Sequence, residues 1–206
     1  MMTQYGFFYD ASRCTGCRTC ELACKDYNNL PVEFSYRHVY EMEGGGWQQD
    51  ENGQWTCDTF TYYLSISCQH CDNPACTRAC PTGAMHKDEN GIVSVDTTKC
   101  IGCGYCAMAC PYNAPHVSRE AGHSMKCDGC KDRVAQGLEP ICVESCSGRA
   151  LFFGPIDELP NAEERAEVAP LPTVDYTQPN LYIKQCPNMR PSGSTEVHLS
   201  NLVEVN

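Results

Sequence analysis

The sequence predicts an α+β fold made of two copies of a small cysteine-rich module, one nested inside the other. A loop-and-strand insertion and an extended C-terminal tail complete the predicted fold. Of the 18 cysteines in the 206-residue chain, all but two fall into four tight quartets. These quartets are two copies of two spacing patterns, and short apolar stretches typical of strands flank them.

One quartet has intervals of two, two and three residues and is followed by Pro111; it consists of Cys100, Cys103, Cys106 and Cys110. This is the spacing of bacterial two-cluster ferredoxins, in which the fourth cysteine binds the neighbouring [4Fe–4S] cube. Gly102 and Gly104 suit the tight loop, because glycine adopts left-handed backbone angles without steric cost. The same spacing occurs once more, with Lys25 in place of the proline, in Cys14, Cys17, Cys20 and Cys24.

The other two quartets have one wider interval each. Intervals of two, four and three residues separate Cys68, Cys71, Cys76 and Cys80, and intervals of two, eleven and three separate Cys127, Cys130, Cys142 and Cys146. Flanking residues repeat as well, since Asp10-Ala-Ser-Arg-Cys14 matches Asp96-Thr-Thr-Lys-Cys100. We therefore expect an outer ferredoxin module at 1–27 plus 120–155, an insertion at 28–67, an inner module at 68–119 and a tail at 156–206.

The exchange of the fourth cysteine between neighbouring cubes predicts four [4Fe–4S] clusters. Their expected ligands are Cys14, Cys17, Cys20 and Cys146 (cluster 1); Cys24, Cys127, Cys130 and Cys142 (cluster 2); Cys68, Cys71, Cys76 and Cys110 (cluster 3); and Cys80, Cys100, Cys103 and Cys106 (cluster 4). Cys57 and Cys186 are left over, and we expect them to be buried or partly buried free thiols. His70 lies inside a quartet loop, but the full cysteine count leaves it no role as a ligand.

The remaining elements follow from local patterns. Strands are expected at 5–9, 60–66 and 150–153, and a hairpin from 84–87 and 91–95 turns at Asn90-Gly91. Trp47 and Trp55 in the insertion are either anchors for a partner or the cover of the insertion's own small core. The acidic, proline-rich tail predicts extended chain with a short helix near 157–168. A free disordered tail is the alternative, but the scattered apolar residues favour a tail that wraps a partner.

Composition excludes several classes. A formal net charge of −11 argues against a nucleic-acid-binding surface, which needs a basic patch. No apolar run is long enough to span a membrane directly, and the first ten residues lack the features of a secretory signal peptide. Disulfide frameworks spread their cysteines more widely than these quartets. Zinc sites built from two C-x₂-C pairs do not need the additional cysteines.

No nucleophile, general base or cofactor-binding glycine loop is visible in the sequence. We therefore expect a non-catalytic electron carrier, with the substrate chemistry on another subunit. A row of clusters needs a donor at one end and an acceptor at the other, so the sequence implies at least two partners.

A wider resemblance lies in the segments 4–10, 13–27, 62–68, 126–130, 153–159 and 168–172. They include Gln4-Tyr-Gly-Phe-Phe-Tyr-Asp10 and Lys126-Cys-Asp-Gly-Cys130. These segments resemble the iron–sulfur subunit of the anaerobic dimethyl sulfoxide reductases, in the complex iron–sulfur molybdoenzyme family. The resemblance covers nearly the whole sequence and weakens in 28–60 and in the last twenty residues or so.

That resemblance implies a three-subunit complex of anaerobic respiration. The chain would relay electrons from an integral-membrane, quinol-oxidising anchor subunit to a molybdopterin catalytic subunit that reduces dimethyl sulfoxide or related S- and N-oxides. Cluster 1 would lie nearest the catalytic subunit and cluster 4 nearest the quinol. Nitrate reductase relatives have tryptophan in place of Cys103 and a [3Fe–4S] end cluster, so Cys103 implies a full cube. Location would be peripheral, on the periplasmic face of the cytoplasmic membrane by co-export with the catalytic subunit, with the cytoplasmic face as the alternative.

Two alternatives remain open from the sequence. The same row of clusters would serve a polysulfide, thiosulfate or selenate reductase or a formate dehydrogenase, because the substrate is recognised by another subunit. A free soluble polyferredoxin would carry the same cysteine motifs without fixed partners.

Overall fold

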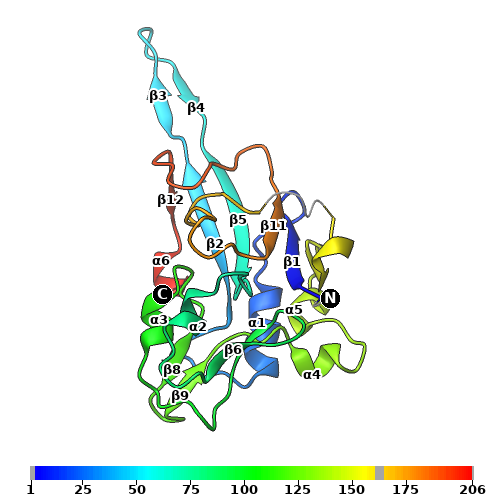
Figure 1. Cartoon of the computed structure of the whole chain (residues 1–206). Helices are drawn as coiled ribbons and strands as arrows, with labels where there is room; N and C mark the ends of the chain where they lie inside the picture. The colour runs from blue at the N-terminus through cyan, green and yellow to red at the C-terminus, as the bar shows by residue number, and fades with distance from the viewer. Residues whose placement is uncertain (1–2, 161–164, 206) are drawn as a thin grey trace.

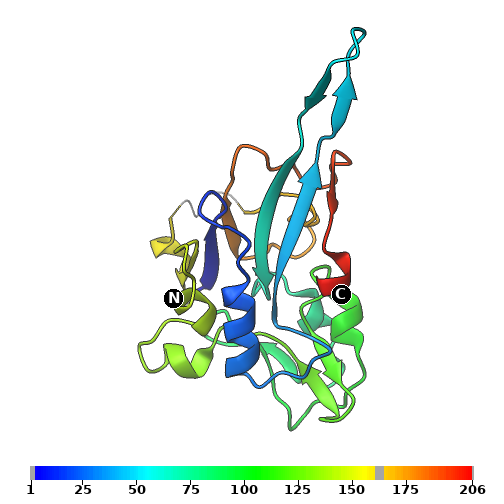
Figure 2. The same ribbon diagram turned by 180° about the vertical axis from the view of Figure 1, so that it is seen from behind.

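The structure, a computed structural model, describes residues 3–160 and 165–205. Short helices and loops form one end of the molecule, two small sheets form its middle, and a narrow β-ribbon projects from the other end (Figures 1 and 2). The helices are α1 Thr19–Tyr27, α2 Ala75–Arg78, α3 Tyr105–Ala109, α4 Lys131–Val134, α5 Ile141–Glu144 and α6 Leu202–Val205. None of the helices in the described ranges is long and apolar enough to cross a membrane.

The first sheet joins three distant parts of the sequence. β1 (Tyr5–Asp10) pairs antiparallel with β10 (Leu151–Pro155) and parallel with β11 (Leu181–Lys184). The strands predicted at 5–9 and 150–153 are confirmed. β11 comes from the tail, and its register places Phe7 opposite Leu181.

The second sheet is built from the insertion and the end of the tail. β2 (Arg37–Gly44) pairs antiparallel with β5 (Phe60–Ser67) over their full length, which confirms the strand predicted at 60–66. β12 (Val197–Leu199) adds to the other edge of β2. One buried cluster connects the two sheets, since Phe7 and Tyr9 of β1 pack with Val39 of β2 and Leu64 of β5.

The projecting ribbon continues the second sheet into solvent. β3 (Trp47–Gln49) and β4 (Trp55–Cys57) pair only with each other, so both faces of the ribbon are exposed. Trp47 and Trp55 are 67% and 58% exposed, so neither covers a core of the insertion. Cys57 is also exposed, and the expectation of a buried thiol there is wrong because a two-stranded ribbon has no interior. Cys186 is partly buried, as predicted.

Small hairpins and a packed tail complete the fold. The hairpin predicted around Asn90-Gly91 is confirmed as β6 (Met85–Lys87) and β7 (Val93–Val95), and a second, unpredicted hairpin consists of β8 (His116–Ser118) and β9 (His123–Met125). The short helix expected near 157–168 is only a 3₁₀ turn at Ile156–Glu158, and 161–164 lie outside the described residues. Arg165 and Val168 instead form β-bridges to Tyr182 and Pro191. The tail lies on the rest of the molecule, so the alternative of a free disordered tail is wrong.

Candidate metal centres

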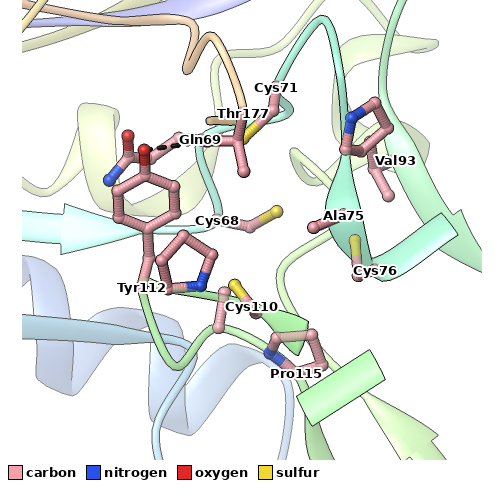
Figure 3. Close-up of a pocket in the computed structure, with 13 residues that line it drawn as sticks. Cys68, Gln69, Cys71, Ala75, Cys76, Val93, Cys110, Tyr112, Pro115 and Thr177 are labelled. Atoms are coloured by element: carbon pink, nitrogen blue, oxygen red, sulfur yellow. Dashed lines mark hydrogen bonds between the residues drawn. The ribbon is translucent and has the colours of Figure 1, made fainter. Parts of the chain in front are cut away.

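Four-cysteine pockets are the main chemical feature of the helical end. The pocket in Figure 3 has an empty volume of about 350 Å³, part of it open to solvent, and four thiols surround one common space in it; they belong to Cys68, Cys71, Cys76 and Cys110. A second pocket of about 330 Å³ is lined by Cys80, Cys100, Cys103 and Cys106. A third, of about 350 Å³, is lined by Cys14, Cys17, Cys20 and Cys146. We name these pockets sites 3, 4 and 1, after the clusters predicted for the same cysteines.

In the remaining quartet, the helix α1 that carries Cys24 packs against the helix α5 that carries Cys142. Burial raises the pKa of the Cys24 thiol, and the neighbouring thiolates of Cys127, Cys142 and Cys130 raise it further. These four cysteines define site 2. The pockets of sites 1, 3 and 4 are each lined by cysteines from two separate motifs.

The sites form a row. Cys20 of site 1 and Cys24 of site 2 lie one turn apart on α1. Cys127 of site 2 and Cys68 of site 3 pack in the same buried cluster. Cys76 of site 3 lies in α2, and Cys80 of site 4 follows directly after that helix. The order along the molecule is therefore 1, 2, 3, 4.

Exposure differs between the ends and the middle of this row. Cys17 of site 1 and Cys103 of site 4 are exposed. In site 2, the buried thiols are those of Cys24, Cys127 and Cys142. In site 3, they are those of Cys68, Cys71 and Cys76. Solvent, or a docked partner, therefore reaches the row at its two ends.

The four loops share one backbone feature. In the first Cys-x-x-Cys segment of each quartet the residue before the second cysteine has a left-handed φ, between 45° and 71°; these residues are Gly16, His70, Gly102 and Gly129. Such a residue turns the backbone so that both thiols face the pocket. Amide groups of the loops also reach sulfur, with Gly129 N–H donating to Cys127 Sγ at 3.4 Å.

A substitution at Gly102 tests whether this loop requires glycine at its left-handed position. Gly102→Ala costs about 1–2 kcal/mol for the left-handed backbone alone, and its new Cβ would lie 2.7 Å from the carbonyl oxygen of Gly122. Gly83→Ala is the matched control, because Gly83 has nearly the same φ of 67° and no atom within 4 Å of the new Cβ. We expect Gly102→Ala to lower the midpoint of thermal unfolding, and the iron content, more than the control does. Equal effects of the two would show that the contact with Gly122 is irrelevant.

Local charges favour thiolates at several positions. Burial raises the pKa of Cys68, but the positive charge of Lys126 and a hydrogen bond from the backbone of His70 outweigh it and lower the pKa below its ordinary value. At the exposed end of site 1, hydrogen bonds from Thr19 and Ser147 lower the pKa of Cys17 to about 7. The thiolate is the form that binds metal.

The donor sets fit [4Fe–4S] clusters. Each cube is held by four cysteine thiolates, one for each iron, and sites 1, 3 and 4 each offer four thiols around a shared space. In the parts of the sequence that the structure describes, no three His, Cys, Asp or Glu side chains converge closely enough to hold a single metal ion.

Comparison with known proteins supplies the family. Residues 5–26 match the family described as "4Fe-4S binding domain", and residues 59–156 match "4Fe-4S dicluster domain". The chain is 61% identical over 206 residues to the B subunit of anaerobic dimethyl sulfoxide reductase from Escherichia coli strain K12, and the match covers 100% of both proteins. The chain therefore belongs to the family of anaerobic dimethyl sulfoxide reductase B subunits.

Other relatives extend this picture. The B subunit of the anaerobic dimethyl sulfoxide reductase from Haemophilus influenzae is 55% identical over 205 residues, which cover 99% of this chain and 100% of the relative. The thiosulfate reductase electron transfer subunit PhsB of Salmonella typhi is 42% identical over 159 residues, or 77% of this chain and 79% of the relative. Membership of the dimethyl sulfoxide reductase family makes this protein a [4Fe–4S]-binding electron-transfer subunit rather than a catalytic one, as the sequence predicted.

Several residues of this reductase subunit that contact the sites escape motif analysis. Ser65 Oγ lies 3.2 Å from Cys20 Sγ, and Ser124 Oγ lies 3.3 Å from Cys106 Sγ. Thr177 of the tail lines site 3 and shares a hydrogen bond of 2.9 Å with Tyr112 (Figure 3). His70 is fully buried, and its Nδ1 accepts the Val93 N–H at 3.1 Å. Serine, threonine and histidine at these spacings carry no metal signature, so only the fold shows their positions.

Proposed function

We propose that this chain carries four [4Fe–4S] clusters and relays electrons from a quinol-oxidising membrane anchor subunit to a molybdopterin catalytic subunit that reduces dimethyl sulfoxide or related S- and N-oxides. The observation that carries this proposal is the row of four-thiol sites with an exposed cysteine at each end. When bound, the clusters supply one-electron chemistry. The protein supplies the spacing, the burial of the middle sites and the two accessible ends.

The ligand sets of this proposal are those predicted for clusters 1 to 4 from the sequence. The shared pockets support the sets of clusters 1, 3 and 4. We also propose that two ferredoxin modules are nested, and a repeated turn supports this: Asp10 accepts the N–H of Ser12 at 3.0 Å, as Asp96 accepts that of Thr98 at 3.0 Å. Each turn leads into the first cysteine of a quartet.

We assign the anchor subunit to the end that holds site 4. Exposed apolar side chains lie within five residues of Cys103 in the sequence there, namely Ile101, Tyr105 and Met108. Such a group of apolar residues is typical of a surface that a protein partner covers. The opposite end, at site 1, would then face the catalytic subunit, and the complex would lie at the membrane, on the periplasmic face by co-export or, as the alternative, on the cytoplasmic face.

Electron transfer through the whole complex tests the function. The complex is purified anaerobically from membranes through a tag on this subunit, its molybdenum content is measured, and the clusters are reduced with a menaquinol analogue. We expect dimethyl sulfoxide to reoxidise the clusters rapidly and thiosulfate to leave them reduced. Reoxidation by thiosulfate alone would favour the thiosulfate reductase alternative, which the identity to PhsB supports. Purification of the loaded protein as a stable monomer without molybdenum would favour a free polyferredoxin.

A further inference from the structure

Two buried cations lie between neighbouring sites. Arg37 of β2 is 1% exposed and Lys126 is 5% exposed. Within the described ranges, neither side chain forms an ion pair with a carboxylate. Burying a charge without a partner costs several kcal/mol, so each cation needs an anion nearby.

Arg37 faces sites 1 and 2. Its Nη1 donates to Ser65 O and Oγ at 3.0 Å each, and the same Ser65 hydroxyl contacts Cys20 of site 1. Its Nε is buried and has no hydrogen-bond partner among the described residues. Burial lowers the pKa of Arg37, but the thiolates of Cys142 and Cys20 outweigh that effect and hold the guanidinium charged.

Lys126 faces sites 2 and 3. Its Nζ donates to the carbonyl oxygens of Val93 and Cys127, which fix the ammonium group in the interior. Cys127 belongs to site 2, and Val93 lines the pocket of site 3. The ammonium group, which donates to both residues, therefore lies between these two sites.

We infer that Arg37 and Lys126 are positioning charges for electron transfer: Arg37 raises the reduction potentials of clusters 1 and 2, and Lys126 raises those of clusters 2 and 3. This inference rests on the proposed cluster assignment. Reduction adds one negative charge to a cluster, and a fixed cation in a low-dielectric interior stabilises that added charge. The clusters in turn supply the anions that the two cations lack.

Redox titration of the purified complex, followed by electron paramagnetic resonance, tests this inference. We expect Arg37→Gln to lower the potentials of clusters 1 and 2 by at least about 59 mV, which is a tenfold change in a one-electron equilibrium. Clusters 3 and 4 should keep their potentials. Lys126→Gln should instead lower the reduction potentials of clusters 2 and 3 and leave the potential of cluster 1 unchanged.

Conservative variants separate charge from shape. Arg37→Lys keeps the positive charge, so the reduction potentials of its clusters 1 and 2 should be closer to the wild-type values than those of Arg37→Gln or Arg37→Met. If the Gln and Met variants fail to load iron, iron content becomes the readout, and Arg37→Lys should load more iron than both. Unchanged potentials in a loaded Arg37→Gln complex, or a Lys variant that behaves no better than Gln, would overturn the inference. Failure of the proposed function is distinguishable, because it would appear in the wild-type complex as missing clusters.

Discussion

Replacement of Cys103 by serine is expected to convert cluster 4 into a [3Fe–4S] cluster and to interrupt electron entry from quinol. Cys103 is one of four thiols that line site 4 and the exposed one among them. Without its thiolate, the iron at that corner lacks a protein ligand and faces solvent. Three cysteines remain for the other irons, so a three-iron cluster is the expected product. Its changed potential should lower the quinol-dependent rate at least about tenfold, or ~1.4 kcal/mol in activation free energy.

Electron paramagnetic resonance of the oxidised complex is the measurement, because a [3Fe–4S] cluster is paramagnetic when oxidised and a [4Fe–4S] cluster of this type is not. Cys57→Ser is the matched control. Cys57 is also exposed, but it lies on the ribbon, where its sulfur contacts Thr59 Oγ1 at 3.0 Å. We expect the control to keep the wild-type spectrum and rate. A Cys103→Ser spectrum identical to that of the control would contradict the ligand assignment at site 4.

Removal of residues 170–206 is expected to lose cluster 3 as well as to weaken assembly with the catalytic subunit. The segment around Thr177 pairs through its backbone with the loop that carries Cys71, since Asn73 N–H donates to Thr177 O at 3.0 Å and Asp72 N–H donates to Gln178 O at 2.8 Å. Asn180 is fully buried and donates to His70 O at 2.9 Å. The truncation would leave this loop and one wall of site 3 without support.

Iron analysis of the truncated protein should therefore show a deficit of at least about four atoms, the content of one cluster. Thr177→Val is a milder control, because it keeps the backbone pairing and removes the hydroxyl that hydrogen-bonds to Tyr112, a bond worth about 1 kcal/mol. We expect the control to keep its full iron content and to co-purify with the catalytic subunit. A truncated protein with normal iron and full co-purification would show that the tail supports neither site 3 nor a partner.

The grouping of the cysteines was predictable because metal ligation constrains spacing strongly. Three cysteines on a tight loop can reach one cube, and the exchange of the fourth cysteine in two-cluster ferredoxins predicts that Cys110 joins Cys68 and that Cys146 joins Cys14. These pairs line common pockets. The strands of β1 and β10 followed from their position next to the repeated motifs. These are local signals that do not depend on the rest of the fold.

The tail and the buried cations were not predictable for the opposite reason. β11 pairs in parallel with β1 across more than 170 residues, as in the pair Phe7 and Leu181, and no local pattern specifies such a partner. The sequence also cannot distinguish Arg37, which is buried between two sites, from arginines on the surface. The exposure of Cys57 depends on a ribbon that packs against nothing else in the described residues, and burial is a property of the whole fold.

Total metal content tests the central claim, a subunit with four [4Fe–4S] clusters, most directly. The complex is purified anaerobically, and iron, acid-labile sulfide and zinc are measured against the amount of this subunit. The account predicts about sixteen iron atoms per copy of this subunit, in addition to any iron that the catalytic subunit holds. It also predicts an equal amount of sulfide and no zinc. Zinc in place of iron, or about half this iron in a fully folded complex, would contradict it.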